Sequence, residues 1–186
     1  FEEALAEAER ARQLDPLSLT AQVWAGAVLY EARQYEGAVE RLRKALEMEP
    51  EFALANFHLG RVYSFMGRYR EALTPLERAA PGFPGALGCL GAAWAKLGRR
   101  DKAEEILQEL QRISAEHYVG PMAFVTVHLG LEDLEAALQW LEKSFDAHEG
   151  IVPLANVDPA FDCLRSDPRF TALLRRLRRM FTSEVL

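Results

Sequence analysis

The strongest constraint on the fold of this chain is an internal repeat of 34 residues. Residues of the same kind return at that interval, as in Gly26 and Gly60, the alanine series Ala4, Ala38, Ala72 and Ala11, Ala45, Ala79, and the proline series Pro16, Pro50, Pro84. A period of this length indicates stacked units, because one unit cannot cover its own apolar face and must bury it against a neighbour. We therefore expect a repeat architecture.

The fullest copy of the repeat lies in residues 53–84, which carry Asn56, Leu59-Gly60, Tyr63, Ala72, Leu76, Ala79 and Pro84. This pattern resembles the tetratricopeptide repeat, a unit of two antiparallel helices whose small residues let the backbones approach each other. The resemblance covers nearly the whole chain. It implies an all-α fold, a right-handed α-α superhelix closed by C-terminal capping helices.

The repeat positions divide the chain into units. We expect the second helix of a truncated repeat at residues 1–14, four repeats at 19–52, 53–83, 84–117 and 118–151, and a C-terminal cap at 152–186. The third repeat starts 31 rather than 34 residues after the second, at a proline and glycine cluster in residues 80–84. This spacing predicts a shortened helix, a tight turn and a change of superhelical pitch there. The fourth repeat is the most divergent, with Val125 where glycine is usual and Ser144 where alanine is usual.

The C-terminal region follows a different pattern. Ser166-Asp167-Pro168 is typical of a helix start, and Phe170, Leu173, Leu174, Leu177 and Phe181 follow at helical spacing. We expect this helix to cover the last repeat and a shorter helical piece to follow Asp158-Pro159. About the last 50 residues are similar to the C-terminal tetratricopeptide regions of bacterial multidomain signalling proteins. The chain begins with Phe1 rather than methionine, so we expect it to be part of a longer protein.

Composition excludes several classes of function. Acidic residues number 28 and basic residues 22, for a net charge of −6, so we expect no general affinity for nucleic acid or for an anionic bilayer. The sequence holds no apolar stretch long enough for a membrane-spanning helix and no signal-peptide pattern. Two cysteines are too few for a disulfide framework, which favours a reducing compartment such as the cytoplasm over the periplasm.

No sequence motif points to catalysis. A P-loop, a Gly-x-Ser-x-Gly motif and a kinase signature are all missing, and the four histidines do not follow zinc-ligand spacing. We therefore predict a protein that is not an enzyme and has no cofactor and no metal ion. His58 and His128 remain open between packing roles and roles as a ligand or a pH switch.

The family resemblance implies that the first helix of each repeat lines the concave side of the superhelix. The positions that usually face the groove include Val23, Tyr30, Glu31, Phe57, Arg61, Phe65, Lys96 and Met122, with Gly88 and Ala92 as small residues midway. A clamp of Lys, Asn and Arg for a terminal carboxylate, known in this family, is not matched by these positions.

The best candidate anchor is the set Phe57, Arg61 and Phe65, whose spacing of four residues puts all three on one helix face. Aromatic and arginine side chains dominate the binding energy of protein interfaces. Our hypothesis is that this face binds an extended or helical segment of a protein partner, with an acidic group opposite Arg61. The alternative is that one or both phenylalanines pack between neighbouring repeats.

Two further surfaces remain open. Arg175, Arg176, Arg178 and Arg179 form a basic cluster that is either a solvated helix face or a site for an acidic partner. The apolar edge around Ala4, Leu5 and Ala8 would allow weak homodimerisation.

The function predicted from the sequence is a non-catalytic protein-interaction scaffold. The alternatives are a regulatory or sensory region of a larger bacterial signalling enzyme or transcription regulator, and a self-assembly module.

Overall fold

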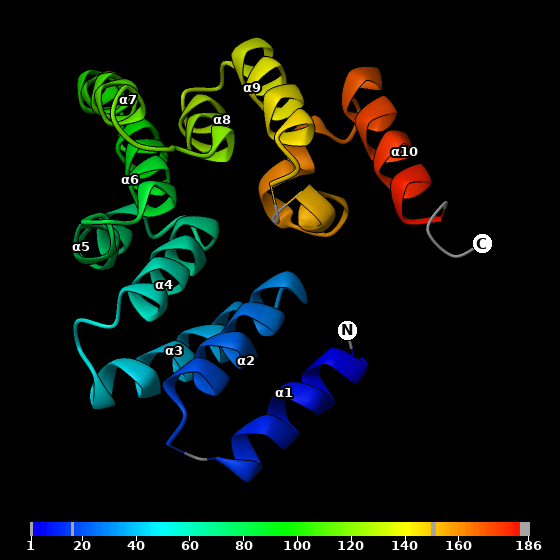
Figure 1. Cartoon of the computed structure of the whole chain (residues 1–186). Helices are drawn as coiled ribbons and strands as arrows, with labels where there is room; N and C mark the ends of the chain where they lie inside the picture. The colour runs from blue at the N-terminus through cyan, green and yellow to red at the C-terminus, as the bar shows by residue number, and fades with distance from the viewer. Residues whose placement is uncertain (1, 16, 150–151, 183–186) are drawn as a thin grey trace.

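The computed structural model describes residues 2–15, 17–149 and 152–182. Within these ranges the chain forms only helices, joined by short turns (Figure 1). The α-helices are α1 (Glu2–Leu14), α2 (Leu19–Glu31), α3 (Tyr35–Met48), α4 (Ala53–Phe65), α5 (Tyr69–Ala79), α6 (Pro84–Lys96), α7 (Arg100–Ser114), α8 (Pro121–Gly130), α9 (Leu134–Asp146) and α10 (Pro168–Thr182). Two 3₁₀ helices, η1 (Val152–Asn156) and η2 (Pro159–Leu164), precede α10.

Successive helices pack as pairs, α2 with α3, α4 with α5, α6 with α7 and α8 with α9. The pairs stack along a curved path, with α1 at one end and α10 at the other (Figure 1). This is the predicted all-α superhelix. The exact repeat boundaries given above stay a prediction.

Close packing within a pair depends on its small residues. A Cβ atom added to Gly60 in α4 would lie 2.4 Å from Cγ of Leu76 in α5, far inside van der Waals contact. Leu76 is fully buried, as is Leu42 at the equivalent position of the preceding pair. In these two pairs the glycine, Gly26 or Gly60, therefore makes room for the leucine that fills the space between the two helices.

The predicted shortening of the second repeat is present. Helix α5 has 11 residues, against 14 in α3, and ends at Ala79. Gly82 in the following turn has a φ of 80°, a left-handed conformation that glycine adopts without strain. Pro84 then opens α6, where its missing N–H costs no hydrogen bond.

Helices α5 and α6 pack on each other across the shortened junction. Helix α8 packs on both helices of the preceding pair, with its backbone close to α6 and its side chains in one apolar cluster with those of α7, such as Leu110 with Phe124. The predicted change of superhelical pitch stays a prediction. A Cβ on Gly88 would lie 2.5 Å from the carbonyl oxygen of Ala123, and a Cβ on Gly130 would lie 2.4 Å from Cα of Ala92. The small residues Gly88 and Ala92 of α6 therefore allow close backbone contact with α8.

The C-terminal helix caps the array as predicted. Pro168 is its first residue, and the Asp167 carboxylate accepts a hydrogen bond of 2.8 Å from the Arg169 amide. One apolar cluster joins this helix to the last repeat, namely Phe170, Leu173 and Leu177 with Leu138, Leu141 and Phe145. The preceding η1 and η2 lie on the inner side of the curve, facing α2 and α4 (Figure 1).

We predict that Gly88→Ala destabilises the protein, because its Cβ would collide with backbone that can yield only if α6 and α8 separate. Overpacking of this kind costs about 1–3 kcal/mol, which exceeds the gain of about 1 kcal/mol that alanine brings to a helix interior. Urea denaturation followed by circular dichroism measures the free energy of unfolding.

The matched control is Gly37→Ala in α3, whose added Cβ would meet only the Leu29 side chain at 3.6 Å. This variant should be as stable as the original chain or more so. A Gly88→Ala variant of the same stability would contradict the close approach of α6 and α8.

Candidate functional site

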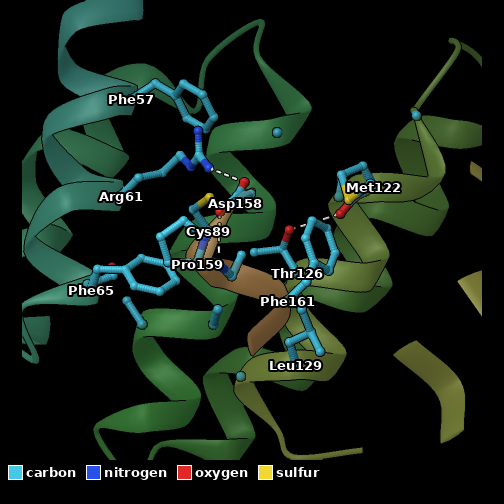
Figure 2. A pocket seen from close by; sticks show the side chains of 18 of the residues that line it. Phe57, Arg61, Phe65, Cys89, Met122, Thr126, Leu129, Asp158, Pro159 and Phe161 are labelled. Atoms are coloured by element: carbon cyan, nitrogen blue, oxygen red, sulfur yellow. Dashed lines mark hydrogen bonds and ion pairs between the residues drawn. The ribbon is translucent and has the colours of Figure 1, made fainter. Parts of the chain in front are cut away.

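The inner side of the superhelix holds a cavity of about 1330 Å³. Helices α4, α6 and α8 form its walls, and the segment around η2 closes it (Figure 2). Its lining is largely apolar and includes Phe57, Phe65, Cys89, Met122, Leu129 and Phe161. Ligand and peptide sites are typically concave, apolar and supplied with a few polar groups, so this cavity is the candidate binding site.

Six of the predicted groove residues line this cavity: Phe57, Arg61, Phe65, Ala92, Lys96 and Met122. Tyr30 is buried and contributes its hydroxyl to the polar contacts described below. Val23 was predicted to face the groove, but it is fully buried in the core between the first two repeats. The prediction for Val23 is therefore wrong, because the stacking of neighbouring repeats covers that side chain.

Both phenylalanines of the candidate anchor also contact neighbouring helices. The Phe57 ring meets the Phe83 ring edge to face at 4.7 Å between centroids. The Phe65 ring meets Tyr30 at 5.3 Å in the same geometry, yet 37% of Phe65 stays exposed. Phe57 is thus mainly a packing residue, whereas Phe65 presents a free surface to the cavity.

Arg61 is the charged centre of the site. Its guanidinium lies over the Tyr30 ring at 4.5 Å and over the Phe57 ring at 5.5 Å, where the faces of the aromatic rings attract a cation. Its Nη2 donates a hydrogen bond of 2.6 Å to Oδ2 of Asp158. The side chains of Arg61 and Asp158 are 10% and 2% exposed, so this is a buried ion pair.

Asp158 lies 97 residues further along the chain, just before η2. Its Oδ1 accepts hydrogen bonds of 2.8 Å from the Tyr30 hydroxyl and 2.8 Å from the Ala160 amide, so the same carboxylate caps η2. The acidic group that faces Arg61 in this structure therefore belongs to the chain itself. Asp158-Pro159 reads in sequence only as a helix start, and no local pattern signals its contact with Arg61.

A second ion pair, which is exposed, also links the region of η2 to the first repeats. Arg33 after α2 donates to Asp162 in η2 at 2.7 Å, and Arg165 donates to the same carboxylate at 2.8 Å. We call residues 156–165 the clasp segment, because these contacts join the C-terminal part of the chain to the first two repeats. Figure 2 shows the Asp158 carboxylate bonded to the Arg61 guanidinium, with Pro159 beside it.

The other titratable residues considered as candidates, His58, His128 and Cys89, are packed against neighbouring side chains. Burial lowers the pKa of His58 to about 3, and the ring lies against Trp24 and Phe57, so it is neutral at physiological pH and no switch. Burial also lowers the pKa of His128, beside Asp133. Cys89 lines the cavity, and burial raises the pKa of its thiol to about 11, which keeps it unreactive.

The basic cluster of α10 lies away from the cavity. Arg175, Arg176 and Arg179 are exposed, and Arg176 donates to Asp146 of α9 at 3.2 Å. The side chain of Arg178 falls outside the described part of the structure.

Among the described residues, no group of histidine, cysteine and carboxylate side chains is placed to hold a metal ion. None of the described helices combines the length and apolar character that crossing a bilayer requires.

Glu31 at the end of α2 lies close to the buried pair. Its Oε2 is buried and lacks a hydrogen-bond partner. Burial, and then the negative charge of Asp158, raise the pKa of Glu31 from 4.5 to about 7, against the opposing charges of Arg61 and Arg33. The site therefore contains a carboxyl group that favours its neutral form when the protein is folded.

Comparison with known proteins agrees with this architecture. Residues 29–84 match the sequence model of the tetratricopeptide repeat family. A search of curated proteins found no match. Residues 29–84 therefore resemble the tetratricopeptide repeat in sequence, and nearly all of the described chain shares the fold of tetratricopeptide repeat proteins.

Three solved structures illustrate the shared fold. A tetratricopeptide repeat protein from Parabacteroides merdae is 14% identical, with 96% of this chain and 71% of that chain covered and a TM-score of 0.53. YrrB, described as a tetratricopeptide repeat protein with an unusual peptide-binding site, is 19% identical, with 90% and 89% covered and a TM-score of 0.53. MamA protein is 24% identical, with 63% and 68% covered and a TM-score of 0.54. At these identities the likeness shows the fold alone.

We predict that Glu31→Gln stabilises the protein more at pH 8 than at pH 5. The folded-state pKa of Glu31 is raised, so its contribution to stability is fully present below its unfolded value of 4.5 and is lost as pH rises through about 7. Glutamine cannot ionise and avoids that loss. The measurement is the Tm of both chains at the two pH values. If the difference in Tm between the variant and the original chain is the same at pH 5 and at pH 8, Glu31 does not titrate in this range.

Proposed function

We propose that this chain is a non-catalytic protein-interaction module that binds a segment of a protein partner on its concave side. The observation that carries the proposal is the cavity of about 1330 Å³, because it presents large apolar side chains next to cations on the inner face of a repeat array. Tetratricopeptide arrays generally serve as scaffolds for protein partners. YrrB, which shares the fold and is described as having a peptide-binding site, supports the same use of the fold here.

The accessible part of the groove defines the contacts that a partner would make. Phe65 and Met122 offer apolar surface, and Lys96 stands at the rim, where it pairs with Glu132 at 2.7 Å. Such exposed pairs contribute about 0–1 kcal/mol and are readily exchanged for a partner's charge. A partner segment would therefore bind through apolar anchors, with acidic groups near the cations.

The alternative of a regulatory region in a larger bacterial signalling protein keeps the same binding mechanism. The resemblance of the C-terminal residues to such proteins supports it. The two cysteines are unpaired, which supports a reducing compartment such as the cytoplasm. Reading the gene upstream of Phe1 tests the alternative, since a kinase, cyclase or winged-helix sequence there would establish it and an unrelated sequence would remove it.

We predict that the triple variant Phe65→Ala, Lys96→Ala, Met122→Ala loses the partner while keeping its fold. These side chains line the cavity and are partly exposed, unlike Phe57 and Arg61, whose removal would disturb the core. The measurement is a pull-down from source-cell lysate with mass spectrometry, after circular dichroism has shown native helicity.

The matched control is Lys44→Ala, Met48→Ala on α3, which removes a similarly exposed cation and apolar side chain outside the cavity. This variant should retain the partner. Loss of the same protein from both variants, or from neither, would contradict binding in the groove.

Self-assembly through the N-terminal edge is a separate proposal, supported by exposed apolar side chains there. Besides Ala4, Leu5 and Ala8 of the predicted edge, Leu14 at the end of α1 is 81% exposed and Leu17 after it is 75% exposed. If this edge pairs with a second copy, light scattering should show a dimer that forms with rising concentration and is lost in a Leu14→Ser, Leu17→Ser variant. A monomer at every concentration would exclude the proposal.

A further inference from the structure

The clasp segment presents two carboxylates to two arginines of the first repeats. Asp158 binds Arg61 at 2.6 Å, and Asp162, four residues later, binds Arg33 at 2.7 Å. Both carboxylates therefore reach arginines of the first two repeats, Asp158 from the residue before η2 and Asp162 from within it. The groove thus already contains a segment with the acidic character expected of a partner.

The two sides of the clasp segment are attached in different ways. On the C-terminal side, Phe161 and Leu164 are 2% and 0% exposed and pack in one cluster with Phe170. Toward α2 and α4 the contacts are mainly ion pairs and hydrogen bonds of side chains, and few Cα atoms of η2 come near either helix. The contacts of the clasp segment with α2 and α4 can therefore break while Phe161 and Leu164 stay packed against the C-terminal helix and the last repeat.

We propose that the concave face around Arg61 recognises an acidic turn of the form Asp-Pro-x-x-Asp, and that the clasp segment is an internal occupant of this site. A protein partner that carries such a turn takes the place of the clasp segment. This inference rests on the proposed function, since it names the chemistry of the segment that the groove binds.

The chemistry of the site selects this kind of partner. Arg61 is buried, and removing the counter-ion of a buried charge costs about 3–5 kcal/mol, so a neutral or basic segment cannot take the place of Asp158. The Tyr30 hydroxyl adds a second donor to the same carboxylate. Proline after the aspartate fixes the backbone for the start of a helix, and the aspartate then also caps that helix through the Ala160 amide. An external turn with the same residues satisfies every one of these groups.

The test uses a synthetic peptide with the sequence of residues 156–165, carrying serine in place of Cys163, titrated into the full ¹⁵N-labelled chain. The variant Asp158→Ala empties the carboxylate position, so its peptide affinity should be at least about tenfold higher than that of the original chain, a gain of about 1.4 kcal/mol. Nuclear magnetic resonance shifts should change at the amides around Tyr30 and Arg61. If the alanine variant loses its helical circular dichroism, the same titration uses Asp158→Asn, which keeps the size of the side chain but not its charge.

The matched control is Asp167→Ala. Asp167 also precedes a proline and caps a helix, but its ion pair is with Arg169, away from the groove. This variant should bind the peptide as weakly as the original chain. A peptide with asparagine in place of its first aspartate should bind no variant.

Equal affinity of the original and Asp158→Ala chains would overturn the inference, and so would a peptide that binds none of the chains or shifts only residues of α10. Failure here is distinct from failure of the proposed function. If the lysate partner still depends on Phe65, Lys96 and Met122 while the peptide does not bind, the groove binds a partner of other chemistry.

Discussion

The buried ion pair between Arg61 and Asp158 organises the inner side of this molecule. A cation with 10% exposure is costly unless its charge and hydrogen bonds are satisfied. Here the faces of Tyr30 and Phe57 flank the guanidinium and Asp158 neutralises it. Because α2, α4 and the clasp segment all contribute, the pair fixes how the C-terminal part of the chain sits against the first two repeats.

That contact requires the array to turn back on itself, and the small residues of α6 allow it. Gly88 and Ala92 bring α6 against the backbone of α8 at Ala123 and Gly130. The fourth repeat is followed by η2, which lies on the inner side of the curve, within reach of Arg61 (Figure 1). Two glycines thus position a carboxylate that lies far from them in the sequence.

The sequence was sufficient for the fold because the repeat is a local pattern. Small residues every 34 positions, the helix starts at Pro84 and Pro168, and the shortened α5 can all be read from neighbouring residues. The close approach of α6 and α8 could not be predicted, since glycines in a first helix are compatible with either an open groove or a close contact. Val23 was misplaced for a similar reason, because burial by the next repeat depends on the stacking angle.

The candidate site was predictable only in part. The spacing of Phe57, Arg61 and Phe65 identified one face of α4, and the cavity lies on that face. The partner of Arg61 was not predictable, because 97 residues separate it from Asp158 and the acidic turn shows only its local role as a helix cap. The raised pKa of Glu31 follows from its burial and then from the charge of Asp158, and the sequence of the first repeat alone reveals neither cause.

The clasp also changes the way such a chain is expected to fold. A linear repeat array has contacts between neighbours only, so its units form independently and quickly. The bonds from Asp158 to Tyr30 and Arg61 span 128 and 97 residues, and that from Asp162 to Arg33 spans 129. Contacts of such long range form after the local helix pairs, because they require the intervening repeats to be in place. They couple the first repeats to the last and give a solenoid the cooperativity of a globular domain.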